Sequence, residues 1–216
     1  MVAKQRLKSP RARLFVALDL PADVREGLAA WQRDELNVDE LRPAAPQTLH
    51  MTLAFLGYQR ERDIEAIAAA ATTIDVAAPE LRLLPDPVAR PPRGRPRLFA
   101  IEAESPGAIE LQAEVEAGLV EAGFHEPEKR DFWPHLTVAR VRSERRARDG
   151  EGGKGRRRDG RPMRVSARPG PLPDALLQPF RAVRVSLYRS LLRPSGAEYV
   201  SMAHVELPTR GSGKAS

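Results

Sequence analysis

The sequence predicts an α+β fold of two pseudo-symmetric lobes, each a small, mostly antiparallel sheet backed by a helix, with a central cleft. A strand–helix–strand unit occurs twice, and both copies open on Arg-Leu-Phe, at residues 13–15 and 97–99. Both copies end on a His-x-Thr strand, with 35 residues from Phe15 to His50 and 36 from Phe99 to His135. A self-similar pattern at nearly constant spacing indicates a duplicated structural unit.

The first unit has a clear pattern in each of its three elements. The apolar run at residues 13–18 predicts a strand. A helix is expected from Pro21 through Trp31, because proline is tolerated in the first turn of a helix. Residues 49–56 predict the second strand, which Gly57 ends.

The second unit has the same order. Residues 97–101 predict its first strand. A helix is expected to begin at residues 105–107 and to end at Gly123, since its apolar residues fall at roughly helical spacing. Residues 133–139 predict the closing strand, so the two units match element by element.

The remaining segments connect or extend these units. An amphipathic helix, a short strand and a turn rich in proline and arginine are expected between them, at residues 63–78, 81–83 and 85–96. Residues 182–188 alternate as a strand should, and 199–207 form its hairpin partner across residues 194–196.

The domain organisation follows from this order. We expect a disordered N-terminus at residues 1–10, one bilobal domain at 11–207 and a disordered tail at 208–216. Within the domain, residues 143–173 are rich in Gly, Arg and Pro and predict a long basic insertion, with room for a brief strand at 163–165.

Composition narrows the class of protein. The 216 residues include no cysteine, which excludes disulfides, thiolate nucleophiles and Cys-based zinc sites. No apolar run reaches the roughly 18 residues that a membrane span requires. No signal-type apolar segment follows the basic N-terminus. The expectation is a soluble, cytoplasmic monomer that does not contact a membrane.

Charge points to a partner. The net charge is +6, and residues 140–168 alone contain twelve Arg or Lys against four Asp or Glu. A local basic excess favours a polyanion, with nucleic acid first. A solvated, arginine-rich loop is the alternative.

The two His-x-Thr strands are the candidate site. Residues i and i+2 of a strand share a face, so His50 lies beside Thr52 and His135 beside Thr137. A pseudo-two-fold relation between the lobes would bring both pairs into one cleft. The other two histidines, His125 and His204, have no such counterpart and are expected to be structural or at the surface.

This set of side chains suits phosphodiester chemistry. One neutral imidazole can accept a proton from water while its charged partner donates one to the leaving oxygen. The threonine hydroxyls can donate hydrogen bonds to the non-bridging oxygens of the phosphate. His50 and His135 are 85 residues apart and fit no compact ligand motif, so neither a metal nor another cofactor is expected.

These features resemble the 2H phosphoesterase superfamily and, within it, the RNA 2′,3′-cyclic phosphodiesterases also called 2′-5′ RNA ligases. The matching segments are residues 13–17, 50–57 and 133–140, with a closing pattern at 187–190 and 196–199. The resemblance implies hydrolysis of a 2′,3′-cyclic phosphate, on RNA or a small cyclic nucleotide, to a 2′-phosphomonoester.

The resemblance also implies roles for individual residues. His50 would be the proton donor and His135 the proton acceptor, with Thr52 and Thr137 holding the phosphate. Phe55 would stack on a base and Arg140 would pair with the phosphate. Strict strand alternation, however, places Phe55 and Arg140 on the face opposite the histidines, so a bulge, a strong twist or a strand end would be needed. A core aromatic is the alternative for Phe55.

Other functions stay open from the sequence. The same site could ligate 2′-5′ RNA ends or cleave 2′-5′-linked oligonucleotides, and a non-catalytic RNA-binding module would use the basic segment alone. The symmetry of the site does not fix which histidine is the acid.

Overall fold

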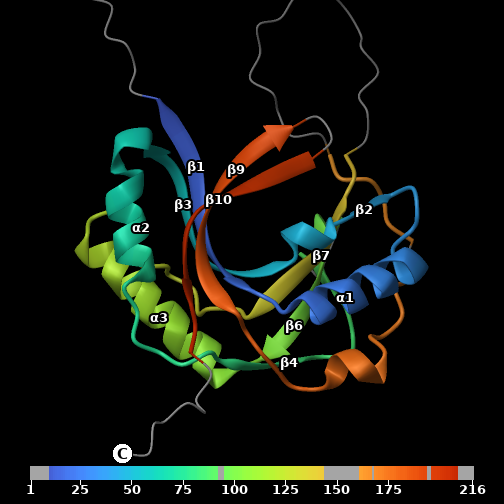
Figure 1. Cartoon of the computed structure of the whole chain (residues 1–216). Coiled ribbons are helices and arrows are strands. Elements are labelled where there is room, and N and C mark those ends of the chain that lie inside the picture. Colours follow the sequence, from blue (N-terminus) through green and yellow to red (C-terminus); the bar gives the residue numbers. More distant parts are fainter. Residues whose placement is uncertain (1–9, 92–94, 144–160, 167, 194–195, 209–216) are drawn as a thin grey trace, which may run out of the picture.

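The strands form one strongly curled, antiparallel path with helices on both sides (Figure 1). The computed structural model describes residues 10–91, 95–143, 161–166, 168–193 and 196–208. Along the path the strand order is β10-β9-β1-β3-β7-β6-β4-β8, with β2 paired to β7 and β5 paired to β6.

The two predicted units are both present. The first consists of β1 (Arg11–Asp19), α1 (Ala22–Glu35) and β3 (His50–Arg60), and the second of β6 (Leu98–Glu104), α3 (Pro106–Glu121) and β7 (His135–Val141). The predicted fold class is confirmed.

The units meet where β3 pairs with β7, at Met51 and Leu136, and both of these side chains are fully buried. β1 lies beside β3 and β6 lies beside β7, so the strand order is mirrored around this junction. Because His50 and His135 each precede one of the paired residues, the junction holds the two His-x-Thr pairs close to each other.

The helices are exchanged between the units. α1 belongs to the first unit, but Gln32 on α1 donates a hydrogen bond of 2.7 Å to the Val138 carbonyl in β7, and the helix lies over the β6–β7 side (Figure 1). α3 belongs to the second unit and packs against β3. α2 (Ile64–Thr72) packs against α3, β9 and β10. Each half of the sheet is therefore backed by a helix, as predicted, but that helix comes from the other unit.

Several short elements complete the structure. Outside the two units and α2, the strands are β2 (Leu41–Pro43), β4 (Glu80–Leu83), β5 (Val88–Arg90), β8 (Phe180–Arg181), β9 (Arg184–Arg193) and β10 (Gly196–Glu206). Turns of 3-10 helix occupy η1 (Pro46–Thr48), η2 (Glu61–Asp63) and η3 (Asp174–Leu177). β2 and β5 were not predicted, because three-residue strands containing or flanked by proline show no usable periodicity.

Other local predictions were wrong as well. The second strand of the first unit, which was expected to end at Gly57, continues to Arg60, and Gly57 is paired with Leu14. The helix expected over 63–78 ends at Thr72, where the Thr72 and Thr73 hydroxyls donate to the Ala68 and Ala69 carbonyls of the last turn. Residues 163–165 form no strand, and the nearby pairing is an isolated bridge between Ser143 and Pro162.

Some predicted segments lie outside the described residues. These are most of the N-terminus at 1–10, most of the basic insertion at 143–173, the tail after residue 208, and residues 194–195 of the hairpin turn. Among the described helices, none has the length and apolar character to cross a membrane.

Candidate active site

A β-bulge follows each His-x-Thr pair. In β3, pairing with β1 passes from Val16–Ala54 to Ala17–Thr52, which leaves Leu53 as an extra residue. A bulge reverses the alternation of side chains beyond it. Leu53 and Ala54 are accordingly both buried, and Phe55 returns to the face that carries the histidine.

β7 contains a bulge at the equivalent position. Its pairing with β6 passes from Phe99–Ala139 to Ala100–Thr137, so Val138 is the extra residue. Val138 and Ala139 are both fully buried, and Arg140 is exposed. The placement expected from strict alternation is therefore wrong for both Phe55 and Arg140, for the same physical reason.

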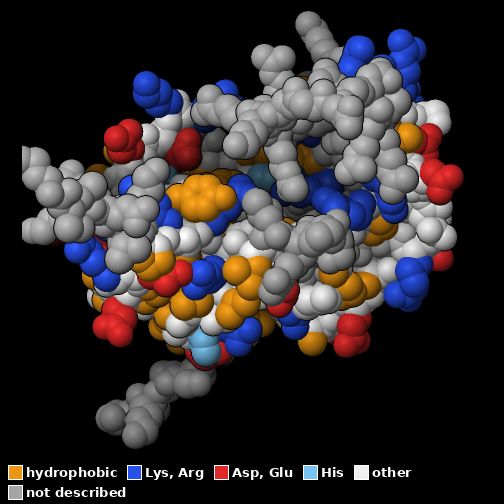
Figure 2. Space-filling view, turned by 90° about the horizontal axis from the view of Figure 1, so that it is seen from above, with side chains coloured by type: hydrophobic (Ala, Val, Ile, Leu, Met, Phe, Trp, Pro, Cys, Tyr) orange, Lys and Arg blue, Asp and Glu red, His pale blue; other side chains and the backbone are white. Residues whose placement is uncertain are grey.

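The cleft contains all six predicted site residues. Its volume is about 640 Å³. Its walls include the predicted residues His50, Thr52, Phe55, His135, Thr137 and Arg140. Phe55 is 59% exposed, which places it at the opening of the cleft and not in the core. Viewed from above, Lys and Arg side chains gather around the hollow among hydrophobic ones (Figure 2).

His50 is held by aromatic rings. It stacks on Phe15 at 5.0 Å between ring centroids and meets the edge of Tyr199 at 5.4 Å. Its Nε2 lies 3.2 Å from the Thr52 hydroxyl. Burial lowers the pKa of His50 to about 4, opposed by the nearby Asp19 carboxylate and a hydrogen bond to the Thr48 backbone.

His135 has a fixed tautomer. Its Nδ1 lies 2.7 Å from the Trp133 carbonyl, which can only accept, so Nδ1 carries a hydrogen. The Nε2 of neutral His135 is therefore an unprotonated acceptor. Burial lowers the pKa of His135, and Arg90 adds to this, while the Trp133 carbonyl and Glu102 oppose it.

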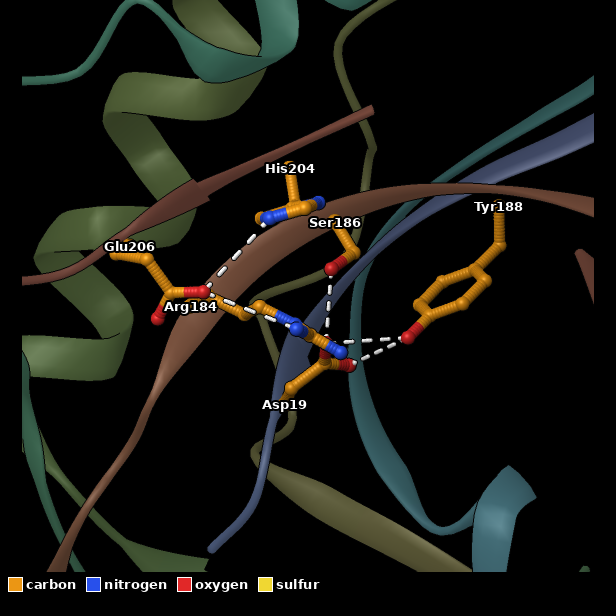
Figure 3. A network of polar contacts seen from close by, with 6 residues as sticks. All are labelled: Asp19, Arg184, Ser186, Tyr188, His204 and Glu206. Atoms are coloured by element: carbon orange, nitrogen blue, oxygen red, sulfur yellow. Dashed lines mark hydrogen bonds and ion pairs between the residues drawn. The ribbon is translucent and has the colours of Figure 1, made fainter. Parts of the chain in front are cut away.

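A buried carboxylate lies behind His50. Asp19 is directly opposite His50 in the β1–β3 register. Arg184 Nε donates to Asp19 at 2.7 Å, Ser186 at 2.8 Å and the Tyr188 hydroxyl at 3.0 Å, and all three converge on the carboxylate in Figure 3. The Tyr188 ring in turn stacks toward His50, at 6.2 Å.

A matching carboxylate lies behind His135. Glu102 is directly opposite His135 in the β6–β7 register. It accepts hydrogen bonds from Arg90 at 2.9 Å and from Trp133 Nε1 at 2.6 Å. Trp133 stacks on the imidazole at 3.7 Å between ring centroids, and the Arg90 guanidinium lies over the Trp133 ring at 4.4 Å.

Each histidine is thus supported by the same three kinds of group: a carboxylate on the neighbouring strand, an arginine, and a ring that both donates to the carboxylate and stacks on the imidazole. Sequence reasoning missed Asp19, Glu102 and Tyr188. The available signal was an acidic residue late in the first strand of each unit, which is Asp19 in β1 but is one of two, Glu102 and Glu104, in β6.

The other two histidines lie elsewhere. His125 Nε2 is 3.4 Å from Glu116, and His204 is half-exposed on β10, 3.7 Å from Glu206. In the part of the chain that the structure describes, no three His, Cys, Asp or Glu side chains are placed to hold a metal ion together.

Comparison with known proteins identifies the family. The model of a family described as the 2′-5′ RNA ligase superfamily matches residues 20–151. An RNA 2′,3′-cyclic phosphodiesterase of Escherichia coli K12 is 32% identical over 132 residues, 61% of this chain and 73% of that protein. Another protein of that name, from Methanocaldococcus jannaschii, is 25% identical over 87% of this chain and 96% of its own length.

Solved structures share the fold. A protein of Thermus thermophilus superposes with a TM-score of 0.70 and 25% identity, covering 92% of this chain and 99% of that one. Escherichia coli LigT complexed with 3′-AMP superposes with a TM-score of 0.65 and 24% identity, over the same shares of both chains.

Proposed function

Because the chain belongs to the 2′-5′ RNA ligase superfamily, we propose that it hydrolyses 2′,3′-cyclic phosphate ends of RNA to 2′-phosphomonoesters by metal-independent general acid–base catalysis. The observation that supports this proposal most is the placement of two His–Thr pairs in one cleft, on strands that meet at Met51 and Leu136. Relatives named RNA 2′,3′-cyclic phosphodiesterase add to that support.

In the proposed step, His135 acts as the base. Its Nε2 takes a proton from water as the water oxygen bonds to phosphorus, and the hydrogen bond from Nδ1 to the Trp133 carbonyl keeps Nε2 free to accept. His50 acts as the acid. It gives its proton to the 3′ oxygen as the bond from phosphorus to that oxygen breaks. The product has a 2′-phosphate and a 3′-hydroxyl.

The other cleft residues bind the substrate. Thr52 and Thr137 donate hydrogen bonds to the non-bridging oxygens, where charge develops. The Arg140 guanidinium pairs with the phosphate, and the exposed Phe55 ring stacks on the terminal base. Ligation of a cyclic end to a 5′-hydroxyl is the reverse of cleaving a 2′-5′ linkage in the same site, and bulk water favours hydrolysis.

The product of a defined RNA tests the proposal. RNA ending in a 2′,3′-cyclic phosphate is incubated with the protein, with and without EDTA, and the product isomer is identified by its sensitivity to isomer-specific phosphatases or by NMR. We expect a 2′-phosphate in both conditions. A 3′-phosphate would reverse the proposed geometry, and loss of activity in EDTA would contradict the metal-free mechanism. Binding without turnover would favour an RNA-binding module.

The pH dependence follows from the two histidines. The pKa of each lies below its ordinary value of 6.5 in the free protein, because burial disfavours the imidazolium. The acid must be protonated and the base neutral, so kcat/KM follows a bell whose two limbs report these two pKa values. The maximum of such a bell lies midway between the two pKa values. Because both values lie below 6.5, we expect the maximum of kcat/KM on the acid side of 6.5.

A bound phosphodiester changes this profile. Its negative charge favours the imidazolium and raises both pKa values, so the maximum of kcat should lie at higher pH than that of kcat/KM. Initial rates across the acid and neutral range, at saturating and limiting substrate, check both statements. A kcat/KM maximum in the alkaline range would show that other groups control the rate.

A further inference from the structure

The face of β1 and β3 that lines the cleft continues beyond it. Moving away from His50, the cross-strand pairs are Phe15–Phe55 and then, past a second register shift that leaves Leu56 as an extra residue, Arg13–Tyr58 and Arg11–Arg60. Residues directly opposite each other in an antiparallel pair point to the same side.

The intervening pair shows which side that is. Ala12, opposite Gln59, is buried, and the Gln59 amide donates to the Leu56 and Phe124 carbonyls, where Phe124 follows α3 on the back of the sheet. The Arg13–Tyr58 and Arg11–Arg60 pairs therefore face the cleft side.

This extension has the composition of a single-strand binding surface. Tyr58 is 60% exposed and Phe55 59%, the two highest values among the exposed large hydrophobic residues that the structure describes. The three arginines Arg11, Arg13 and Arg60 are exposed, and none of the ion pairs found within the described residues involves them. The nearby Glu61 is already paired with Arg189 at 2.7 Å.

We propose that this face of β1 and β3, formed by Arg11, Arg13, Phe55, Tyr58 and Arg60, binds the single-stranded RNA that precedes the cyclic phosphate. Tyr58 stacks on the base next to the one on Phe55, and the arginines pair with backbone phosphates. Successive pairs advance about 7 Å along β1, a step that an extended nucleotide can span. Exposed rings among unpaired cations are what proteins use to bind single strands without base preference. The proposal rests on the proposed function and adds that an oligonucleotide is preferred over a mononucleotide.

The test compares two substrates. For each variant, kcat/KM is measured with a hexanucleotide RNA ending in a 2′,3′-cyclic phosphate and with 2′,3′-cyclic AMP. The variants are Tyr58→Ala and the double variant Arg11→Ala/Arg60→Ala. We expect Tyr58→Ala to lower kcat/KM for the oligonucleotide about tenfold, the value of one stacking contact, and the double variant, which removes two phosphate contacts, to lower it by at least as much. Turnover of cyclic AMP should stay at the wild-type level, because these residues lie beyond the lining of the cleft.

Matched controls separate charge and ring chemistry from general damage. Tyr58→Phe keeps the ring and should keep the preference for the oligonucleotide. Arg33→Ala removes an exposed charge from α1 and should leave kcat/KM for both substrates unchanged. The salt dependence of kcat/KM for the oligonucleotide should weaken in Arg11→Ala/Arg60→Ala.

Three outcomes would overturn the proposal. Equal losses of kcat/KM for both substrates, or no loss for the oligonucleotide, would show that this face does not bind the RNA. Either result would leave the proposed function in place. A wild-type protein that turns over neither substrate would remove the proposed function and this inference with it.

Discussion

Replacing either His50 or His135 with alanine is expected to lower kcat for RNA 2′,3′-cyclic ends on the order of 10³-fold, because in the proposed mechanism each imidazole transfers a proton in the chemical step. The two losses should not add. A site that needs an acid and a base together loses most of its rate when one is missing. The double variant should therefore be little slower than either single variant. Single-turnover rates with a cyclic-ended RNA measure this directly.

His204→Ala is the matched control. His204 is half-exposed on β10, outside the cleft lining, so its loss should leave kcat unchanged. Binding of RNA that lacks a cyclic end should survive in all three single variants, which shows that the proteins are folded. Wild-type kcat in His50→Ala or His135→Ala would mean that the paired motifs do not perform the chemistry.

The largest effect on stability is expected for Asp19→Ala. Asp19 is buried, and its carboxylate accepts hydrogen bonds from Arg184, the fully buried Ser186 and Tyr188. Alanine leaves Ser186 without an acceptor in the interior and removes the carboxylate from the partly exposed Arg184 and Tyr188, which together costs about 3 kcal/mol of the free energy of unfolding. For a chain of this length that corresponds to a fall of roughly 10 °C in Tm. Thermal unfolding followed by circular dichroism measures it.

Glu102→Ala is the informative comparison, since Glu102 has the same kinds of partners as Asp19. The Glu102 side chain is 28% exposed against 10% for that of Asp19, so water can replace more of what is lost. Its substitution should lower the free energy of unfolding by about 1 kcal/mol. Equal losses of Tm in the two variants would show that burial does not set the difference. A wild-type Tm in Asp19→Ala would show that the network does not stabilise the fold.

The repeat allowed much of the architecture to be predicted, because duplicated apolar patterns mark strands and helices wherever they occur. The positions of Phe55 and Arg140 were not predictable by alternation, since period-two reasoning assumes that every residue of a strand is paired. The extra residues Leu53 and Val138 break that assumption. In the sequence, each of these bulges is marked only by two consecutive apolar residues, Leu-Ala in one copy and Val-Ala in the other.

The groups that support the histidines could not be predicted from the sequence for a different reason. Asp19 and Glu102 matter because each lies opposite a histidine, and that depends on the register between strands far apart in the chain. Tyr188 adds a third strand to the same site. Side chains brought together by register have no fixed spacing in the sequence, so an acidic residue in a strand does not by itself show that it will lie opposite a histidine.

The exchange of helices between the two units has a consequence for assembly. The helix of each strand–helix–strand unit packs on the strands of the other unit. One unit alone would therefore leave the apolar face of its own strands exposed to solvent. Two such copies can cover each other only as a reciprocal pair. The covalent connection through α2 makes that pairing intramolecular, so its effective concentration no longer depends on how much protein is present. The bipartite site therefore assembles at any dilution.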